Sequence, residues 1–184
     1  MYGLVNQAVR GLILEQHGEA IWEKIRTKAG TPESFVAMQP YDDAVTYGLV
    51  GAAVEVLGAP AEDILYAFGE YWVKSRATVS YAELMSTAGT EFVDFVKNLD
   101  HMHSRIKVTF PDYSPPSFRV KELSEESLQL DYYSKREGLL PFVEGLMNGV
   151  AEHFGCEITI THVDDAMNPM PSKRMIVTHR RVQD

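Results

Sequence analysis

The chain has a single cysteine, Cys156, among its 184 residues. One thiol cannot form an intrachain disulfide or a cysteine-based zinc site, so both kinds of stabilising site are excluded. Basic residues are also in the minority, because 17 Lys and Arg stand against 26 Asp and Glu, a formal net charge of −9. This balance argues against a nucleic-acid partner, since phosphate binding requires a positive surface.

Long apolar runs are missing as well. No uninterrupted apolar stretch of about 18 residues occurs, so no membrane span is expected. The segment from Met1 to Gly18 mixes apolar and polar residues at helical spacing, unlike the continuous apolar region of a signal peptide. We therefore expect a cytoplasmic protein with no membrane partner.

Aromatic residues and methionine, by contrast, are plentiful. The chain has two Trp, nine Tyr, eight Phe and eight Met. This is enough bulky apolar material to line a cavity as well as to fill a core. The length suits one domain, or one domain with two lobes.

The order of the periodic patterns predicts an α+β fold. Apolar spacing of three and four predicts helices over 2–17, 19–29, 43–57, 61–76, 81–87 and 138–154, and a long helix over 91–108 capped by Thr90. Alternation predicts strands over 118–123, 128–133, 156–163 and 175–181. We expect an N-terminal helical lobe, then a C-terminal lobe with a four-stranded antiparallel sheet and helices.

The predicted helix 91–108 carries a histidine on its apolar face. His103 follows Leu99 by four residues and lies on that face, whereas His101 points away from it. Such a histidine is either a core residue satisfied by a backbone carbonyl or a metal ligand facing an apolar cavity. No second ligand shares the face at helical spacing, so a metal site made of protein alone is poorly supported. A lone axial histidine suits haem, because the porphyrin supplies four ligands.

The end of the predicted strand 128–133 brings three polar side chains together. In an extended segment Tyr132, Ser134 and Arg136 share a face. All three donate hydrogen bonds, and arginine can bind a carboxylate with two of them. They form either a site for paired carboxylates at the mouth of a pocket or an ordinary polar strand end.

Together these residues resemble a known family. His103, followed 29 residues later by the pattern Tyr132-x-Ser134-x-Arg136, is similar to the H-NOX (haem–nitric oxide/oxygen binding) domain. This is the haem domain of soluble guanylate cyclase and of stand-alone bacterial gas sensors. The segments 1–6, 67–73 and 138–146 also look like bacterial members, so the resemblance covers essentially the whole chain.

The resemblance implies one H-NOX domain over 1–184 that buries haem b (iron protoporphyrin IX) between its lobes. It divides into a distal helical subdomain, 1–60, and a proximal subdomain, 61–184. His103 matches the proximal iron ligand, and the residues Tyr132, Ser134 and Arg136 match the propionate-binding trio. Pro116 matches a proline that presses on the porphyrin. The pocket-lining matches are Val5, Met1, Tyr81 and Leu146, and for the last three plain core packing stays open.

The distal pocket bears on the choice of gas. Oxygen-binding members have a distal tyrosine that donates a hydrogen bond to dioxygen, and its position falls here on Phe142, or on a neighbour that also cannot donate. Trp72 matches a distal position, and its indole N–H either points at the iron or serves only as bulk. A hydrogen bond to a charged group is worth about 1.5–3 kcal/mol. An apolar pocket therefore favours nitric oxide over oxygen.

The implied function is a haem-based sensor of nitric oxide and carbon monoxide, and not an enzyme. Nitric oxide would weaken or break the bond between ferrous iron and His103, and the helix of His103 would move. Since 184 residues leave no room for an output domain, we expect a partner in trans, such as a histidine kinase or a cyclic-dinucleotide enzyme.

Three alternatives remain open. The first is an oxygen-binding haem protein, and the second is an interaction domain that binds a small apolar ligand without haem. The third is an enzyme that uses paired acids and histidines, namely Asp42, Asp43, Asp164, Asp165, His153 and His162. We interpret these six residues as solvated surface, because adjacent acids point different ways and no nucleophile motif such as GxSxG accompanies them.

Overall fold

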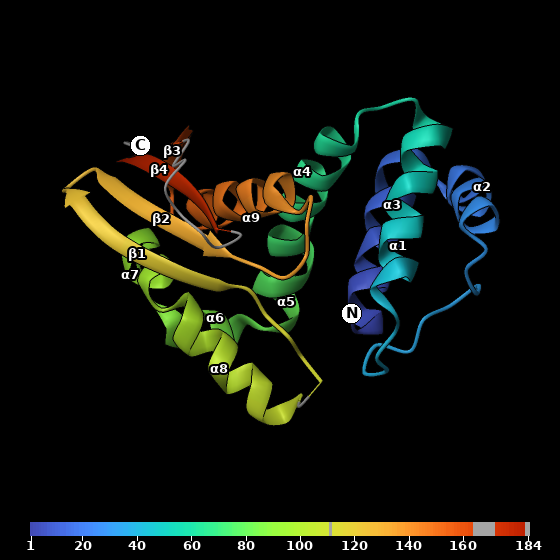
Figure 1. Cartoon of the computed structure of the whole chain (residues 1–184), viewed down its shortest axis with the longest axis horizontal. Helices are drawn as coiled ribbons and strands as arrows, with labels where there is room; N and C mark the ends of the chain where they lie inside the picture. Colours follow the sequence, from blue (N-terminus) through green and yellow to red (C-terminus); the bar gives the residue numbers. More distant parts are fainter. Residues whose placement is uncertain (111, 164–171, 183–184) are drawn as a thin grey trace.

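The computed structural model describes residues 1–110, 112–163 and 172–182. Helices come first, and two strands, a helix and two strands follow (Figure 1), as the α+β prediction requires. The helices are α1 (Gly3–His17), α2 (Glu19–Ala29), α3 (Asp43–Leu57), α4 (Ala61–Trp72), the π-helix η1 (Val73–Ala77), α5 (Thr78–Ser80), α6 (Ala82–Ala88), α7 (Phe92–Lys97), α8 (Leu99–Thr109) and α9 (Leu140–His153). The strands are β1 (Ser117–Ser124), β2 (Ser127–Tyr133), β3 (Cys156–Val163) and β4 (Ser172–Arg181).

Helices α1, α2 and α3 form a lobe with its own core, at the right of Figure 1, which we call the helical lobe. Apolar side chains at helical spacing fill it, and Leu12, Trp22, Ile25 and Leu49 are among the most buried. The carboxylate of Asp42 caps α3 by accepting a hydrogen bond from the Ala44 amide at 2.8 Å. This cap fixes the start of α3. The first residue of α3, Asp43, faces the other lobe.

The second lobe, which we call the sheet lobe, is built on an antiparallel sheet with strand order β1-β2-β4-β3. Along β2 the side chains of Leu128, Leu130 and Tyr132 are buried and pack with residues of α7 and α9 in one core. On the opposite face Asp131 lies directly across from Arg174 of β4, and the two side chains form an ion pair at 2.7 Å. One covered and one polar face is the usual arrangement of an antiparallel sheet.

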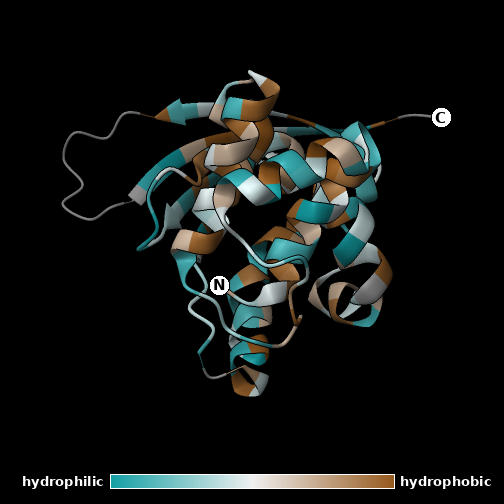
Figure 2. Ribbon diagram, turned by 90° about the vertical axis from the view of Figure 1, so that its right-hand side faces the viewer, coloured by the Kyte–Doolittle hydropathy of each residue, from teal (hydrophilic) through white to brown (hydrophobic). Residues whose placement is uncertain are grey.

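Helix α4 joins the two lobes. It contacts α1 and α3 on one side and α9 on the other. The crossing with α9 is so close that a Cβ on Gly145 would overlap the carbonyl oxygen of Tyr66, and a Cβ on Gly69 would lie 2.6 Å from the amide nitrogen of Leu146. Trp72, at the end of α4, packs against the cores of both lobes. In Figure 2 apolar and polar bands alternate around the helices, as expected when each buries only one side.

Two predicted helices differ in detail from the structure. The helix expected over 91–108 is interrupted at Asn98, whose backbone (φ −94°, ψ 3°) separates α7 from α8. The Asn98 side chain donates a hydrogen bond to the carbonyl of Ala88 at 2.8 Å, which holds the break in place. Thr90 does not cap this segment, because α7 begins after the extended residue Glu91. The helix expected over 61–76 becomes the π-helix η1 from Val73, an irregularity that often accompanies functional sites.

None of the described helices is by itself long and apolar enough to cross a membrane. The segments Asp43–Leu57 and Ala61–Ala77 meet the length and composition criteria only as a pair, across a bend of 118°.

Candidate functional site

A cavity of about 700 Å³ lies where the two lobes meet. It is lined by helices α1, α3, α4, α6, α7, α8 and α9, by η1, by strands β1 and β2, and by the segment that leads from α8 into β1. Most of its lining is apolar, with side chains such as Val50, Leu65, Phe68, Phe95, Leu99, Met102 and Met147. A concave, mainly apolar space of this size with a few polar groups is typical of a site for a small molecule or a cofactor.

His103 lines this cavity from α8, whereas His101 is exposed. Two aromatic rings flank the imidazole: Tyr113 lies edge-on with ring centroids 6.1 Å apart, and Phe118 lies tilted at 5.9 Å. Burial lowers the pKa of His103, although the nearby Asp100 carboxylate and Pro116 carbonyl oppose the shift. The ring is therefore neutral near pH 7, the form that ligates metals.

The helix that carries His103 is anchored to the sheet through Asp100. One carboxylate oxygen accepts a hydrogen bond from the Phe118 amide at 2.6 Å, and the other accepts one from the Ser117 hydroxyl at 2.7 Å. Asp100 lies three residues before His103, so the two side chains leave α8 on neighbouring turns. A shift of His103 is thus coupled directly to the start of β1.

Tyr132, Ser134 and Arg136 all line the cavity. Strand β2 ends at Tyr133, so only Tyr132 lies in the sheet, and the prediction that a single strand face carries all three was wrong. A hydrogen bond from the Arg136 amide to the Ser134 hydroxyl, at 3.0 Å, folds the loop and brings the side chains to the same space. Burial raises the pKa of the Tyr132 phenol, although the Ser134 hydroxyl and the Arg136 charge act to lower it. The phenol therefore keeps the proton that it can donate.

The Arg136 guanidinium bridges the two lobes. Its Nε donates to Asp43 of α3 at 2.6 Å and its Nη2 donates to the same carboxylate at 3.3 Å, while Nη1 donates to the Ser114 carbonyl at 2.7 Å. The N-terminal ammonium of Met1 also donates to Asp43, at 2.7 Å. A guanidinium has five N–H donors, so Arg136 retains capacity for a further carboxylate.

Asp43, interpreted from the sequence as solvated surface, is partly exposed but is also paired with two charged groups. Partial burial pushes the pKa of this carboxyl up, but the hydrogen bonds and charges of Arg136 and the N-terminus outweigh burial, and the pKa lies below its usual range. No pattern in the sequence could reveal this pairing, because Arg136 lies 93 residues further along the chain.

Phenylalanine and tryptophan side chains cover another part of the cavity wall. Phe142 of α9 packs against Phe68 at a centroid distance of 4.8 Å, and Trp72 lies edge-on to Phe68 at 6.4 Å. Nothing within the described ranges accepts a hydrogen bond from the Trp72 indole N–H. The remaining predicted lining residues, Met1, Val5, Tyr81, Pro116 and Leu146, also face the cavity. The individual roles of all these residues stay predictions.

Sequence reasoning missed one more side chain of this cavity, Tyr113. It follows a turn in which its amide donates to the Phe110 carbonyl at 2.9 Å. Burial raises the pKa of its phenol to about 12. The one available signal was its place in the proline-containing segment between His103 and Pro116, both of which were expected at the same cavity.

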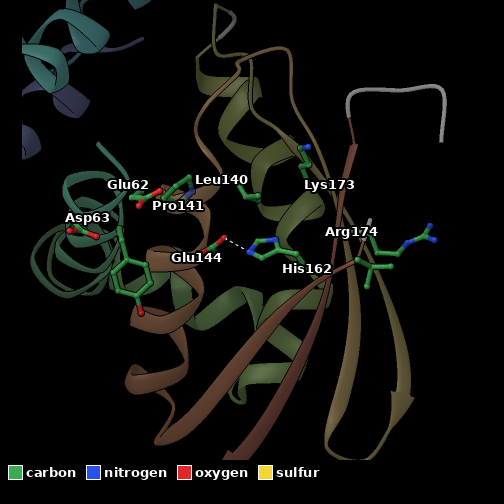
Figure 3. Close-up of a pocket in the computed structure, with 10 residues that line it drawn as sticks. Glu62, Asp63, Leu140, Pro141, Glu144, His162, Lys173 and Arg174 are labelled. Atoms are coloured by element: carbon green, nitrogen blue, oxygen red, sulfur yellow. Dashed lines mark ion pairs between the residues drawn. The ribbon is translucent and has the colours of Figure 1, made fainter. Parts of the chain in front are cut away.

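The acids and histidines considered for an enzyme do not converge. His162 pairs with Glu144 at 2.9 Å, in a second pocket of about 550 Å³ that Glu62 and Asp63 of α4 and Lys173 and Arg174 of β4 also line (Figure 3). His153 is exposed at the end of α9, and Asp164 and Asp165 lie outside the described residues. Within residues 1–110, 112–163 and 172–182, no three His, Cys, Asp or Glu side chains gather as metal ligands.

The cavity fits a haem. It offers one neutral imidazole within an apolar space, and so the remaining iron ligands must come from the cofactor itself. It also offers a phenol, a hydroxyl and a guanidinium with unused donors, which suit the two carboxylates of haem. His103 would hold the iron, and Tyr132, Ser134 and Arg136 would hold the propionates.

Comparison with known proteins agrees with this chemistry. A family model described as Haem-NO-binding matches residues 2–162. The chain is 28% identical over 166 residues to soluble guanylate cyclase gcy-31 of Caenorhabditis elegans. The matched segment covers 89% of this chain and 24% of the relative. The chain thus spans about a quarter of the length of that relative.

Solved structures show the same fold. A mutant of an H-NOX protein from S. oneidensis, in its Fe(II) state, superimposes on this chain with a TM-score of 0.88. The two sequences are 21% identical, and the match covers 100% of this chain and 98% of that one. In its Fe(II)NO state the TM-score is 0.85, at 22% identity, covering 98% and 100%. With the family pattern matched along most of its length and the fold matched throughout, the chain belongs to the Haem-NO-binding, or H-NOX, family of haem-binding sensor domains.

Proposed function

We propose that the chain is a sensor of nitric oxide that carries haem b and uses His103 as its protein ligand to ferrous iron. The observation that carries the proposal is a single buried, neutral imidazole in an apolar cavity whose edge bears Tyr132, Ser134 and Arg136. The cofactor supplies the gas-binding position. His103 would supply the nitrogen ligand, Tyr132, Ser134 and Arg136 would bind the propionates, and the apolar wall would exclude water.

The composition of the cavity wall supports nitric oxide as the ligand, with carbon monoxide as a second one. Phe68 and Phe142 pack together on this wall, and neither can donate a hydrogen bond. Bound dioxygen gains most from a donor, at about 1.5–3 kcal/mol for a hydrogen bond to a charged group. Neither nitric oxide nor carbon monoxide depends on such a donor.

The route of the signal starts at α8. Loss of the bond between His103 and iron would free α8 to shift about its break at Asn98. Asp100 would carry that shift to β1, and Phe110, just after α8, would carry it to Tyr2 of the helical lobe, 5.2 Å away between ring centroids. A helix with two alternative positions is the kind of element through which ligand binding alters a surface.

The output of this sensor would be a partner protein in trans, such as a histidine kinase or a cyclic-dinucleotide enzyme. The sensing domain itself performs no chemistry in this proposal. The two lobes, bridged by Arg136 and Asp43, would change their relative position and present a different surface to the partner.

A second candidate, oxygen binding, is favoured by one observation. The Trp72 indole lines the cavity, and its N–H donor has no acceptor among the residues that the structure describes. A donor left free in this way can serve bound dioxygen. Trp72→Phe keeps an aromatic ring and removes the donor, so it should abolish any stable oxygen complex that the wild type forms in air.

The proposal is tested by spectroscopy of the purified protein. A red protein with an intense Soret band that survives desalting is expected, and ferrous protein should bind nitric oxide and carbon monoxide. His103→Gly should lose the five-coordinate ferrous spectrum and regain it when imidazole is added. The matched control is His101→Gly, an exposed histidine two residues away, which should behave as wild type. A colourless protein that takes up no haem would leave the haem-free ligand-binding domain as the better explanation.

A further inference from the structure

Tyr113 contacts His103 but has no part in the proposed function. Its side chain lines the cavity, largely buried, between the end of α8 and the start of β1. The ring stands edge-on to the imidazole, with an interplanar angle of 77° and 6.1 Å between centroids. Phe118 contacts the same imidazole at 5.9 Å. Of these two aromatic neighbours only Tyr113 carries a hydrogen-bonding group.

The Tyr113 hydroxyl is unused. In the described part of the chain no residue donates a hydrogen bond to it or accepts one from it. Two other hydroxyls of the cavity lining are occupied: Tyr47 donates to the Glu137 carbonyl at 3.0 Å, and Thr46 donates to Asn6 at 2.6 Å. What distinguishes Tyr113 is that its ring contacts the candidate iron ligand while its hydroxyl is free to hydrogen-bond.

His103 needs a partner whenever it leaves the iron. The Pro116 carbonyl interacts with one side of the ring, and release would leave the nitrogen that had bound the iron unpaired in a mainly apolar surrounding. A buried polar atom with no partner is unfavourable, so release depends on what can receive the freed nitrogen. The nitrogen that had bound the iron offers its lone pair, and a phenol O–H is a suitable donor.

We propose that Tyr113 is a positioning residue that receives His103 after nitric oxide binding, its hydroxyl donating a hydrogen bond to the freed imidazole nitrogen. The inference rests on the proposed function. The phenol keeps its proton throughout, and the only bond broken is the one between iron and His103. Tyr113 thus sets how completely the imidazole is released, and with it the fraction of protein in the signalling state.

Tyr113→Phe in the holoprotein tests this directly, since it keeps the ring and removes the hydroxyl. Absorption and electron paramagnetic resonance of the nitric oxide complex, over a range of temperatures, give the ratio of His103-released to His103-bound protein. The loss of one hydrogen bond should lower that ratio roughly two- to tenfold. The Fe–His stretching frequency of the ligand-free ferrous protein should not change, because the hydroxyl acts only after release.

Control variants separate this role from general effects on packing. Tyr47→Phe removes a hydroxyl at the same cavity that does not contact His103, and it should leave the ratio at the wild-type value. Tyr113→Leu removes the ring as well and should also shift the Fe–His stretching frequency. If the wild type is fully released at every temperature, the variant must instead show faster rebinding of His103 once nitric oxide is scavenged.

Two outcomes overturn the inference in distinguishable ways. If wild type releases His103 and Tyr113→Phe matches it in both ratio and rebinding rate, Tyr113 does not receive the imidazole, although the proposed function stands. If wild type never releases His103, the proposed signal route fails and this inference fails with it.

Discussion

The crossing of α4 and α9 makes a sharp prediction about stability. Replacing Gly145 with alanine adds one methyl group between two backbones, where its Cβ would overlap the Tyr66 carbonyl oxygen and lie 2.9 Å from the carbonyl carbon and 3.1 Å from the Glu70 amide nitrogen. Backbone atoms cannot rotate away as a flexible side chain can. The helices must therefore move apart for Gly145→Ala to fold.

Two opposing free energies decide the result. Alanine favours a helix over glycine by about 1 kcal/mol. Overpacking by one carbon costs about 1–3 kcal/mol, and contact with backbone on the facing helix puts this site at the upper end, about 3 kcal/mol. Gly145→Ala should therefore lower the free energy of unfolding by about 2 kcal/mol net.

Gly51→Ala is the matched control. Gly51 lies in the middle of α3, is exposed, and has no described atom within 4 Å of where its Cβ would lie. Only the helix preference acts there, so this variant should be more stable than wild type by up to about 1 kcal/mol.

Equilibrium unfolding in urea, followed by circular dichroism, measures both variants. The two midpoints should differ by about 1 M urea or more, with wild type between them. Equal stabilisation of Gly145→Ala and Gly51→Ala would show that α4 and α9 do not approach as closely as described, and the reasoning would be refuted.

Three further predictions concern the charges and the cavity. Asp131→Asn should lower the free energy of unfolding by about 2 kcal/mol near neutral pH, because it removes the carboxylate that accepts hydrogen bonds from the Arg174 guanidinium and the Gln129 amide; since the Arg174 hydrogen bond lowers the pKa of Asp131, the difference from wild type should shrink in urea titrations as the pH falls below about 4. Arg136→Ala should speed loss of haem to an apoprotein acceptor by roughly ten- to hundredfold, and Arg136→Lys should not restore it, because lysine lacks the bidentate geometry. Phe142→Tyr places a donor in the cavity and should raise oxygen affinity by roughly tenfold or more in gas titrations of ferrous protein; an unchanged affinity would mean that this ring does not face the bound gas.

The order of helices and strands was predictable because apolar periodicity is a local property of the chain. The break at Asn98 was not, since Phe95, Leu99 and Met102 keep the same apolar stripe in phase across it. Periodicity reports which face is buried. It does not report whether the backbone along that face is continuous.

The cavity residues were predictable for a different reason, the resemblance to a family with a distinctive pattern. Neither apolar periodicity nor the family resemblance predicted the features that depend on two distant segments of the chain. The pairing of Asp43 with Arg136 joins residues 93 positions apart, and the glycines of α4 and α9 carry no sign of their partner helix. Such contacts are set by how the lobes dock, which neither spacing nor propensity encodes.

The position of Trp72 between two cores gives the protein an optical probe of its own. The chain has two tryptophans, and the other, Trp22, is fully buried within the helical lobe. A chromophore in the cavity would quench the emission of Trp72, which lines it, more strongly than that of Trp22, which does not. Intrinsic fluorescence can therefore report occupancy of the cavity, and no label is needed.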